Sequence, residues 1–278
     1  MAAERAASLA RTVDRHELPT RVYLDIYASR RPLPGRSRAV QPAWPQLDVD
    51  FVHSVCASRP PRPHLPFFGS SASEPFEMDG ITVRARAAEA RRARMPEDGF
   101  FLYRSPGFIS RAWGAPVPPE ATRIYLALRA SDARWFLNDA FEALRRGLRG
   151  FAMKTLANPR NYARADAAVV YVPTDVLQTA LELMQFELAS GGIMPRAETP
   201  LGTNPVSGGM AWADSPIDEA ETSTSFGQWI TSLLLEAERR FGSGIDRDQL
   251  ARLCTEKGRE LDRIYRRNSA EIRTDAAE

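Results

Sequence analysis

Residues 122–129 carry the clearest structural pattern in the chain, an alternation of side chains between two faces. Ile124, Leu126 and Leu128 fall on one face, whereas Arg123 and Tyr125 fall on the other. A period of two residues is typical of a β-strand. The patterns that follow predict a helix, two strands, a second helix and a further strand, over residues 131–148, 151–157, 167–172, 173–191 and 208–213.

The predicted order β-α-β-β-α-β is the split arrangement of many α+β sheets. We therefore expect an α+β fold, a mixed and mostly antiparallel sheet with helices packed on one side of it. Beyond this core, residues 100–104 are predicted to form a strand and residues 201–205 a loop. Ser225 is expected to cap an amphipathic helix over 226–241, and a last helix is predicted over 246–268.

The N-terminal part has a different composition. Residues 3–30 have helical spacing with a break at Pro19, and residues 31–75 carry nine of the 21 prolines, which is typical of an extended arm. Residues 82–95 are predicted to form a short helix with five arginines, either a solvated face or a docking surface for an acidic peptide. We expect a helical and proline-rich extension over 1–80 and a catalytic-type domain over 81–278.

Composition excludes several classes of protein. The two cysteines, Cys56 and Cys254, indicate neither a disulfide framework nor a cysteine-based metal site. No apolar run is long enough for a membrane span or a signal core, which predicts a cytoplasmic protein without a membrane partner. A net charge of only +2 gives no reason to expect nucleic acid as a ligand. No cluster of histidines and carboxylates has metal-ligand spacing, so no metal or organic cofactor is expected.

Lysine is rare in this sequence. Of the 37 basic residues besides histidine, only Lys154 and Lys257 are lysines, which leaves 35 arginines (37 minus 2). Lys154 is flanked by Phe151, Met153 and Leu156. A lysine desolvated by apolar neighbours can have its pKa lowered and act as a base, whereas arginine does not usefully release its proton. The alternative is a structural lysine that extends from a strand edge into water.

The predicted strands place these side chains relative to one another. Lys154 lies on the face of the strand 151–157 opposite to Met153, and a helical crossover can bring this face next to that of Arg123 and Tyr125. The loop just beyond this strand carries Arg160, Tyr162 and Arg164, before the next predicted strand begins.

A guanidinium, a phenol and an amine together suit the removal of phosphate from phosphoserine or phosphothreonine by β-elimination. Arginine forks bind the phosphate dianion, a neutral lysine removes the α-hydrogen, and a tyrosine can donate a proton to the departing phosphate. Hydrolysis through a nucleophile or two metal ions fits less well, because neither a cysteine beside an arginine loop nor a set of metal ligands is present.

Several segments resemble a known family. The segments that carry the resemblance are Arg123–Leu128, Phe151–Lys154, Tyr162–Val172, Thr199–Pro216 and Ser225–Gln228. Together they are similar to the HopA-type effector-like family, whose members serve as lyases in the biosynthesis of class V lanthipeptides and thioamitides. That family is in turn similar to the phosphothreonine lyases secreted by type III systems. The resemblance covers roughly residues 100 to 240 and leaves out the first 80.

The resemblance implies roles for individual residues. In the secreted lyases a Lys-x-His strand precedes the catalytic lysine by some thirty residues; here Tyr125 precedes Lys154 by 29 (154 minus 125), so tyrosine stands at the position of the acid. Lys154 is thus the expected base and Tyr125 the expected acid. The expected phosphate ligands are Arg123, Arg160 and Arg164, and further site candidates are Tyr162, Tyr171 and Arg196.

The resemblance also implies partners. We expect a lyase that acts on a precursor peptide phosphorylated by a partner kinase, a phosphotransferase, and that passes the dehydroalanine or dehydrobutyrine product to a cyclase. The alternative is a non-catalytic protein that binds the phosphopeptide, holds a kinase and cyclase together, or resembles the effectors.

Overall fold

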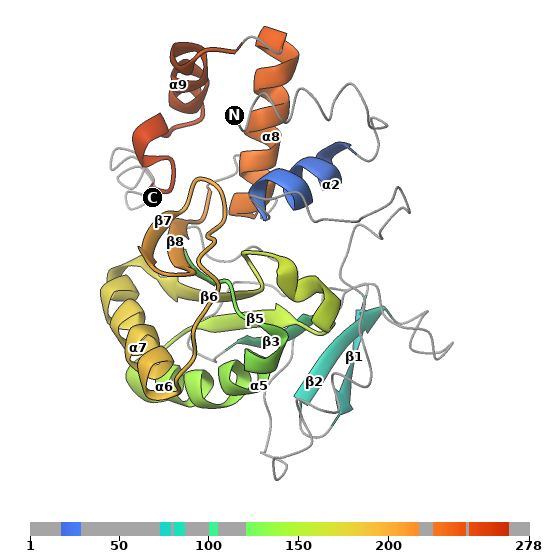
Figure 1. The fold of residues 1–278 in the computed structure, drawn as a ribbon, viewed down its shortest axis with the longest axis vertical. Coiled ribbons are helices and arrows are strands. Elements are labelled where there is room, and N and C mark those ends of the chain that lie inside the picture. Colours follow the sequence, from blue (N-terminus) through green and yellow to red (C-terminus); the bar gives the residue numbers. More distant parts are fainter. Residues whose placement is uncertain are drawn as a thin grey trace, which may run out of the picture.

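The structure, a computed structural model, describes residues 18–28, 73–78, 81–86, 100–104, 121–216, 225–242 and 245–266. The predicted helical residues 3–17, most of the proline-rich arm and residues 87–95 of the predicted arginine-rich helix lie outside these ranges. The described strands form one sheet in the order β1-β2-β3-β5-β6-β4-β8-β7, with helices against it (Figure 1). This confirms the predicted α+β fold.

The centre of the sheet consists of four strands, β5 (Ala152–Leu156), β6 (Ala168–Pro173), β4 (Ala121–Leu126) and β8 (Met210–Asp214). The helical connection from β4 to β5 passes over β6, and the one from β6 to the edge strand β7 (Asn204–Ser207) passes over β4 and β8. All the pairings between described strands are antiparallel. Within the described ranges the sheet therefore lacks the parallel pairs that define a mixed sheet.

Three outer strands extend the sheet beyond β5. The predicted strand 100–104 is confirmed as β3 (Phe100–Arg104), which pairs with β5. Next to it lies a hairpin of β1 (Ser73–Met78) and β2 (Ile81–Arg86). The predicted helix over 82–95 is therefore wrong for residues 82–86, where Ile81, Val83 and Ala85 alternate with polar residues at the period of a strand.

One short strand lies where a loop was predicted. β7 (Asn204–Ser207) pairs with β8 at the other edge of the sheet, although residues 201–205 were expected to be loop. Its pairing includes a register shift near Pro205, which lacks a backbone donor. Gly209, with a φ of 72°, closes the turn into β8.

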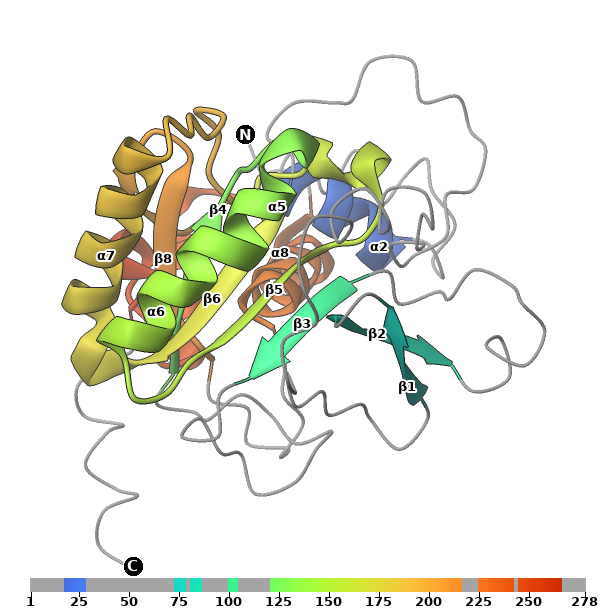
Figure 2. The same ribbon diagram turned by 90° about the horizontal axis from the view of Figure 1, so that it is seen from below.

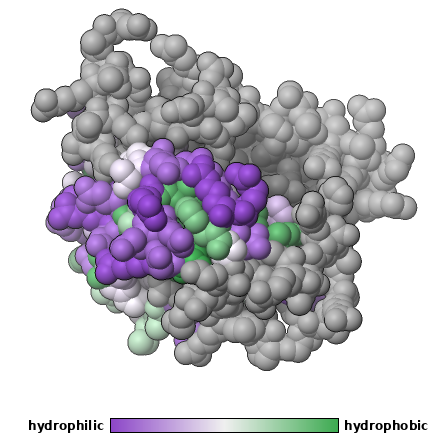
Figure 3. All heavy atoms as spheres, turned by 90° about the horizontal axis from the view of Figure 1, so that it is seen from above, coloured by the Kyte–Doolittle hydropathy of each residue, from purple (hydrophilic) through white to green (hydrophobic). Residues whose placement is uncertain are grey.

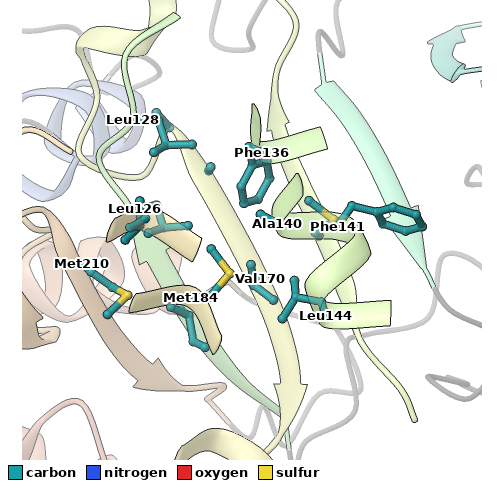
Figure 4. Packing of buried hydrophobic residues seen from close by; sticks show 14 of the residues in the cluster. Leu126, Leu128, Phe136, Ala140, Phe141, Leu144, Val170, Met184 and Met210 are labelled. Carbon is teal, nitrogen blue, oxygen red and sulfur yellow. The ribbon is translucent and has the colours of Figure 1, made fainter. Parts of the chain in front are cut away.

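Helices on one face of the sheet enclose the larger core (Figures 2 and 4). A continuous helical run of η2 (Ala130–Asp132), α5 (Ala133–Trp135), η3 (Phe136–Ala140) and α6 (Phe141–Gly147) packs beside α7 (Leu177–Ser190), which follows η5 (Thr174–Val176). Apolar side chains of these helices, such as Phe136, Leu144 and Met184, pack against strand residues such as Leu126 and Val170. The apolar face predicted for the strand 122–129, with Ile124, Leu126 and Leu128, therefore lies against this core.

The opposite face is covered as well, so the expectation of helices on one side only is wrong. It carries α2 (Leu18–Val22) with the π-helical turn η1 (Tyr23–Tyr27), and α8 (Phe226–Phe241). Figures 1 and 2 show these helices on the side of the sheet away from α6 and α7. The reason is that small and apolar residues such as Ala121, Val169 and Ala213 make this face hydrophobic too. Residues 18–28, assigned to the extension, thus share a core with the sheet.

The C-terminal helices begin as the sequence predicts. Ser225 caps α8 in a reciprocal hydrogen-bonded arrangement with Gln228, and Asp246 caps α9 (Arg247–Glu256) in the same way with Gln249. α9 ends earlier than predicted because Gly258 takes a φ of 72°, and the short turn η7 (Leu261–Arg263) follows it. The surface over α8, α9 and α2 is largely hydrophilic with a narrow hydrophobic strip (Figure 3).

None of the described helices is both long and apolar enough to cross a membrane.

Candidate functional site

The central strands place the predicted site residues in two adjacent rows on one face of the sheet. One row runs Ala152, Tyr171, Arg123 and Ala213 across β5, β6, β4 and β8. The next row runs Lys154, Val169, Tyr125 and Ala211. Directly paired residues of antiparallel strands project to the same side. The structure therefore brings Lys154, Tyr171, Arg123 and Tyr125 together.

Lys154 and Tyr125 face each other across β6. Both are paired with Val169, so their backbones are separated by two strand spacings, about 10 Å. Lysine and tyrosine are long enough to extend toward each other over the shorter valine. Lys154 is half-buried, whereas Tyr125 is only 4% exposed. The two side chains thus lie on either side of Val169 in the same row of the sheet.

Tyr171 lies between the two cations of the site. The Cζ of Arg123 is 5.5 Å and the Nζ of Lys154 is 5.8 Å from the centre of its ring. Both distances are within the range of cation–π attraction. Tyr171 is 7% exposed, so its buried ring links the buried guanidinium of Arg123 to the half-buried amine of Lys154.

Arg123 and Tyr125 are electrostatically coupled. Burial lowers the pKa of Arg123, but the hydroxyls of Tyr125 and Tyr171 outweigh it and hold that pKa raised. Burial also raises the pKa of Tyr125 to about 12, although Arg123 opposes the shift. Tyr125 thus keeps its proton throughout the neutral range. The Nε of Arg123 is buried and has no hydrogen-bond partner among the described residues.

The segment 18–28 forms the cover over these rows. The Ala28 carbonyl accepts a hydrogen bond from the Ala165 N–H at 2.6 Å, and the Tyr27 carbonyl accepts one from the Leu201 N–H at 3.1 Å. The rings of Tyr23 and Tyr27 lie 5.1 Å apart between centres, and Tyr27 packs edge-on against Phe226. Two tyrosines four residues apart therefore point from one helical turn onto the site face.

Gly227 allows this cover to lie close to α8. A Cβ atom there would be 2.5 Å from the Tyr23 ring and closer still to the Tyr27 ring. We expect Gly227→Ala to lower the free energy of unfolding by ~1–3 kcal/mol, the usual cost of overpacking. This loss is expected even though alanine stabilises a helix by ~1 kcal/mol relative to glycine. Denaturant titration measures this. Gly208→Ala, where a Cβ meets nothing within 4 Å, is the control; equal stabilities of the two variants would contradict the close fit.

Arg164 is held in a buried network with Asp166 and Tyr23. Its Nε donates to one carboxylate oxygen of Asp166 at 2.8 Å and its Nη2 to the other at 2.7 Å. The Tyr23 hydroxyl donates to Asp166 at 2.6 Å and accepts from Arg164 at 3.2 Å. Burial would raise the pKa of Asp166, but Arg164, Tyr23 and the nearby charge of Lys154 hold it below its usual range. Arg164 thus lies beside the site with three donated hydrogen bonds already made, two to Asp166 and one to Tyr23.

The other predicted residues lie away from the two rows. Tyr162 is buried in the core on the opposite face, where its hydroxyl donates to the Leu156 carbonyl at 2.7 Å and lies 2.8 Å from the Thr155 hydroxyl. Arg196 donates to the carbonyls of Ala163 and Arg164 and so supports the loop before Asp166. Arg160 is exposed on η4 (Pro159–Ala163), and its role as a phosphate ligand stays a prediction.

Tyr23, Tyr27 and Asp166 were not predicted from the sequence as site residues. The spacing of Tyr23 and Tyr27 within a predicted helix was a usable signal, because residues four apart share a helix face. Asp166 follows Arg164 by two residues, which alone does not distinguish a buried pair from a solvated one. Within the described ranges no group of three or more histidine, cysteine or carboxylate side chains is arranged to hold a metal ion.

The arrangement can bind an anion and exchange protons. Arg123 supplies buried positive charge, Tyr125 a protonated hydroxyl, and Lys154 an amine at the more exposed end of the group. Buried donors of this kind are electrostatically strong because little water competes for them.

Comparison with known proteins gives a consistent result. The model of the HopA1 effector protein family matches residues 94–252, more than half of the chain and all of its central sheet. No curated protein matches the sequence. The solved structure of the effector protein from Pseudomonas syringae pv. tomato strain DC3000 is similar with a TM-score of 0.56 at 17% identity, and covers 96% of each chain. The effector protein from Pseudomonas syringae pv. syringae strain 61 gives a TM-score of 0.55 at 16% identity, again over 96% of each chain. At these identities the likeness concerns the fold, whereas the match of the family model shows that this chain belongs to the HopA1 effector protein family.

Proposed function

We propose that this protein is a lyase that eliminates phosphate from phosphoserine or phosphothreonine in a peptide. The observation that carries the proposal is the pair of rows on the sheet, in which Lys154, Arg123 and Tyr125 surround Tyr171 and Val169. A base, a buried cation and a protonated phenol on one face are the groups that this reaction requires. The resemblance to lyases of lanthipeptide and thioamitide biosynthesis supports the same reaction.

In the proposed reaction Lys154 acts as the base. Its amine takes the α-hydrogen of the phosphorylated residue as a proton, and the electron pair of the Cα–H bond forms the Cα=Cβ double bond. The bond between Cβ and the phosphate oxygen breaks, and its electron pair leaves with the phosphate. The products are dehydroalanine or dehydrobutyrine in the peptide and inorganic phosphate, so neither water nor an oxidant is consumed.

Arg123 and Tyr125 act on the leaving group. The phosphate oxygen gains negative charge as the bond to Cβ breaks, and a buried guanidinium stabilises that charge. The Tyr125 hydroxyl, whose pKa burial raises to about 12, remains protonated and can donate a hydrogen bond or a proton to the same oxygen. Tyrosine thus takes the place that histidine holds in the secreted lyases.

Arg123→Lys is expected to weaken the binding of phosphate. The substitution keeps a positive charge but removes the planar fork, so KM for a phosphopeptide should rise ~10-fold or more, as for loss of a hydrogen bond between charged groups. Steady-state kinetics and the affinity of the unphosphorylated peptide measure this.

The comparison variant for that experiment is Arg164→Lys. It should raise KM less and lower stability more, because the Arg164 fork is bound to Asp166. A larger rise in KM for Arg164→Lys than for Arg123→Lys would make Arg164 the main phosphate ligand. Equal weakening of binding to phosphorylated and unphosphorylated peptides would mean that Arg123 does not contact phosphate.

The biological substrate that fits this reaction is a precursor peptide phosphorylated by a partner kinase. The unsaturated product is an electrophile, and a cyclase that adds a nucleophile to it would use it next. A second candidate function is a scaffold that binds the phosphopeptide without turning it over, which is consistent with the membership in an effector family.

One experiment separates these functions. The purified full-length protein is incubated with a synthetic phosphothreonine peptide, with and without a chelator, and the product mass is measured. Elimination gives a peptide lighter by one water than the unphosphorylated peptide, and the chelator should not reduce the yield. A product with the mass of the unphosphorylated peptide would show hydrolysis instead. Binding without release of phosphate would support the scaffold.

A further inference from the structure

We infer that Tyr27, in the segment that covers the sheet, is a positioning residue for the proposed elimination, with its hydroxyl holding that of Tyr125 toward the leaving phosphate. The inference rests on the proposed function and extends the site to residues that precede the part of the chain matched by the family model. It concerns the hydroxyl of Tyr27, not the packing of its ring.

The position of the Tyr27 hydroxyl indicates such a role. Tyr27 is 1% exposed and belongs to the same apolar cluster as Tyr125, Val169 and Tyr171. Its hydroxyl is buried, and none of the described residues forms a hydrogen bond with it. A buried hydroxyl without a hydrogen bond costs free energy, so its retention at this position points to a use.

The Tyr27 ring is held in place by its neighbours. The Tyr27 carbonyl is bonded to the Leu201 N–H, and the ring is packed against Phe226 and beneath Gly227. The hydroxyl therefore stays beside that of Tyr125, close enough for the two phenols to shift each other's pKa.

The contact between the two phenols has a direction. Burial raises the pKa of both tyrosines, but the contact between their hydroxyls raises the pKa of Tyr27 further and lowers that of Tyr125. Tyr27 is therefore placed as the donor of the pair. When Tyr125 donates to phosphate, Tyr27 can donate to the Tyr125 oxygen, and Arg123 stabilises the same oxygen. The Tyr125 hydrogen is then directed away from Tyr27 and toward the substrate.

The test is Tyr27→Phe in the full-length protein, which removes the hydroxyl and keeps the ring. We expect kcat for a phosphothreonine peptide to fall roughly 10-fold with KM unchanged, the size expected for one hydrogen bond to an oxygen that gains charge. The thermal midpoint should not fall, because the removed hydroxyl makes no full hydrogen bond in the folded state. Tyr265→Phe, at a ring packed edge-on against Trp212 outside the two rows, is the matched control and should retain the kcat of the wild type.

A second readout does not depend on turnover. In protein labelled with carbon-13 at the tyrosine Cζ, the resonance of Tyr125, assigned through Tyr125→Phe, should shift in Tyr27→Phe and not in Tyr265→Phe. An active wild type with an unchanged kcat in Tyr27→Phe would overturn the inference, as would an unshifted Tyr125 resonance. A wild type that releases no phosphate would remove the proposed function first, and with it any role of Tyr27 in elimination.

Discussion

Lys154→Ala should abolish elimination, with turnover of a phosphothreonine peptide reduced ~10²–10⁴-fold, the usual contribution of a positioned general base. The affinity for the peptide should stay within a few-fold, because the phosphate is bound by arginine and not by the amine. Phosphate release measures the first quantity, and fluorescence anisotropy with a labelled phosphopeptide measures the second. Lys154→Arg should fail as fully as alanine, since arginine keeps its proton.

The chain provides a matched control for this experiment. Lys257, the other lysine, lies at the end of α9 and forms an ion pair with Glu236 at 3.0 Å. Because that pair is partly exposed and belongs to neither row of the site, Lys257→Ala should leave turnover unchanged. If Lys154→Ala retains most of its activity, or if Lys154→Arg restores it, the amine is a structural cation and not the base.

Asp166→Asn is expected to cause the largest loss of stability, ~3–5 kcal/mol, which is typical when one partner of a buried ion pair is removed. The substitution leaves the Arg164 guanidinium buried beside a neutral group and weakens the acceptor for the Tyr23 hydroxyl. It therefore loosens both the 159–166 loop and the segment 18–28. Urea denaturation measures the free energy of unfolding.

The effect of Asp166 should depend on pH in a defined direction. The folded-state pKa of this carboxyl is lowered, so its stabilisation is complete above the unfolded value of about 3.9 and is lost as the pH falls through the folded-state value. The difference between wild type and Asp166→Asn should thus be constant near neutral pH and shrink in strong acid.

An exposed ion pair serves as the control for this second prediction. Asp262 is bonded to Arg247 at 2.5 Å, but the two side chains are 78% and 72% exposed. Asp262→Asn should therefore cost no more than ~1 kcal/mol. Similar losses for Asp166→Asn and Asp262→Asn would show that the buried network contributes little to the fold.

Local patterns in the sequence were sufficient for much of the fold. The alternation over residues 122–129 correctly put Ile124, Leu126 and Leu128 against a core and Arg123 and Tyr125 on the other face. Ser225 and Gln228 specified the start of α8, because a capping box is formed by residues only three positions apart. The same local reasoning placed Lys154 on the opposite side of its strand from Met153, as observed.

The main errors in the predicted secondary structure fell on short segments, in which the spacing of apolar residues does not distinguish a helix, a strand and a loop. Residues 82–86 were assigned to a helix because their arginines and alanines favour one, but pairing with β1 and β3 makes them a strand. β7 was missed because four residues with a proline carry too little pattern to be recognised without their partner β8. In both cases the hydrogen bonds to a neighbouring strand outweigh the intrinsic preference of the segment.

The sequence by itself determined which residue types were available and which face of its own strand or helix each one occupies. Tertiary structure alone decided that Lys154 and Tyr125 are both paired with Val169, because the register between strands depends on the whole sheet. It also decided that Tyr23, 143 residues away in sequence, completes the Arg164–Asp166 pair, and that Tyr27 lies beside Tyr125. Contacts of this kind have no local periodicity, since they form only when two apolar faces from distant parts of the chain bury each other.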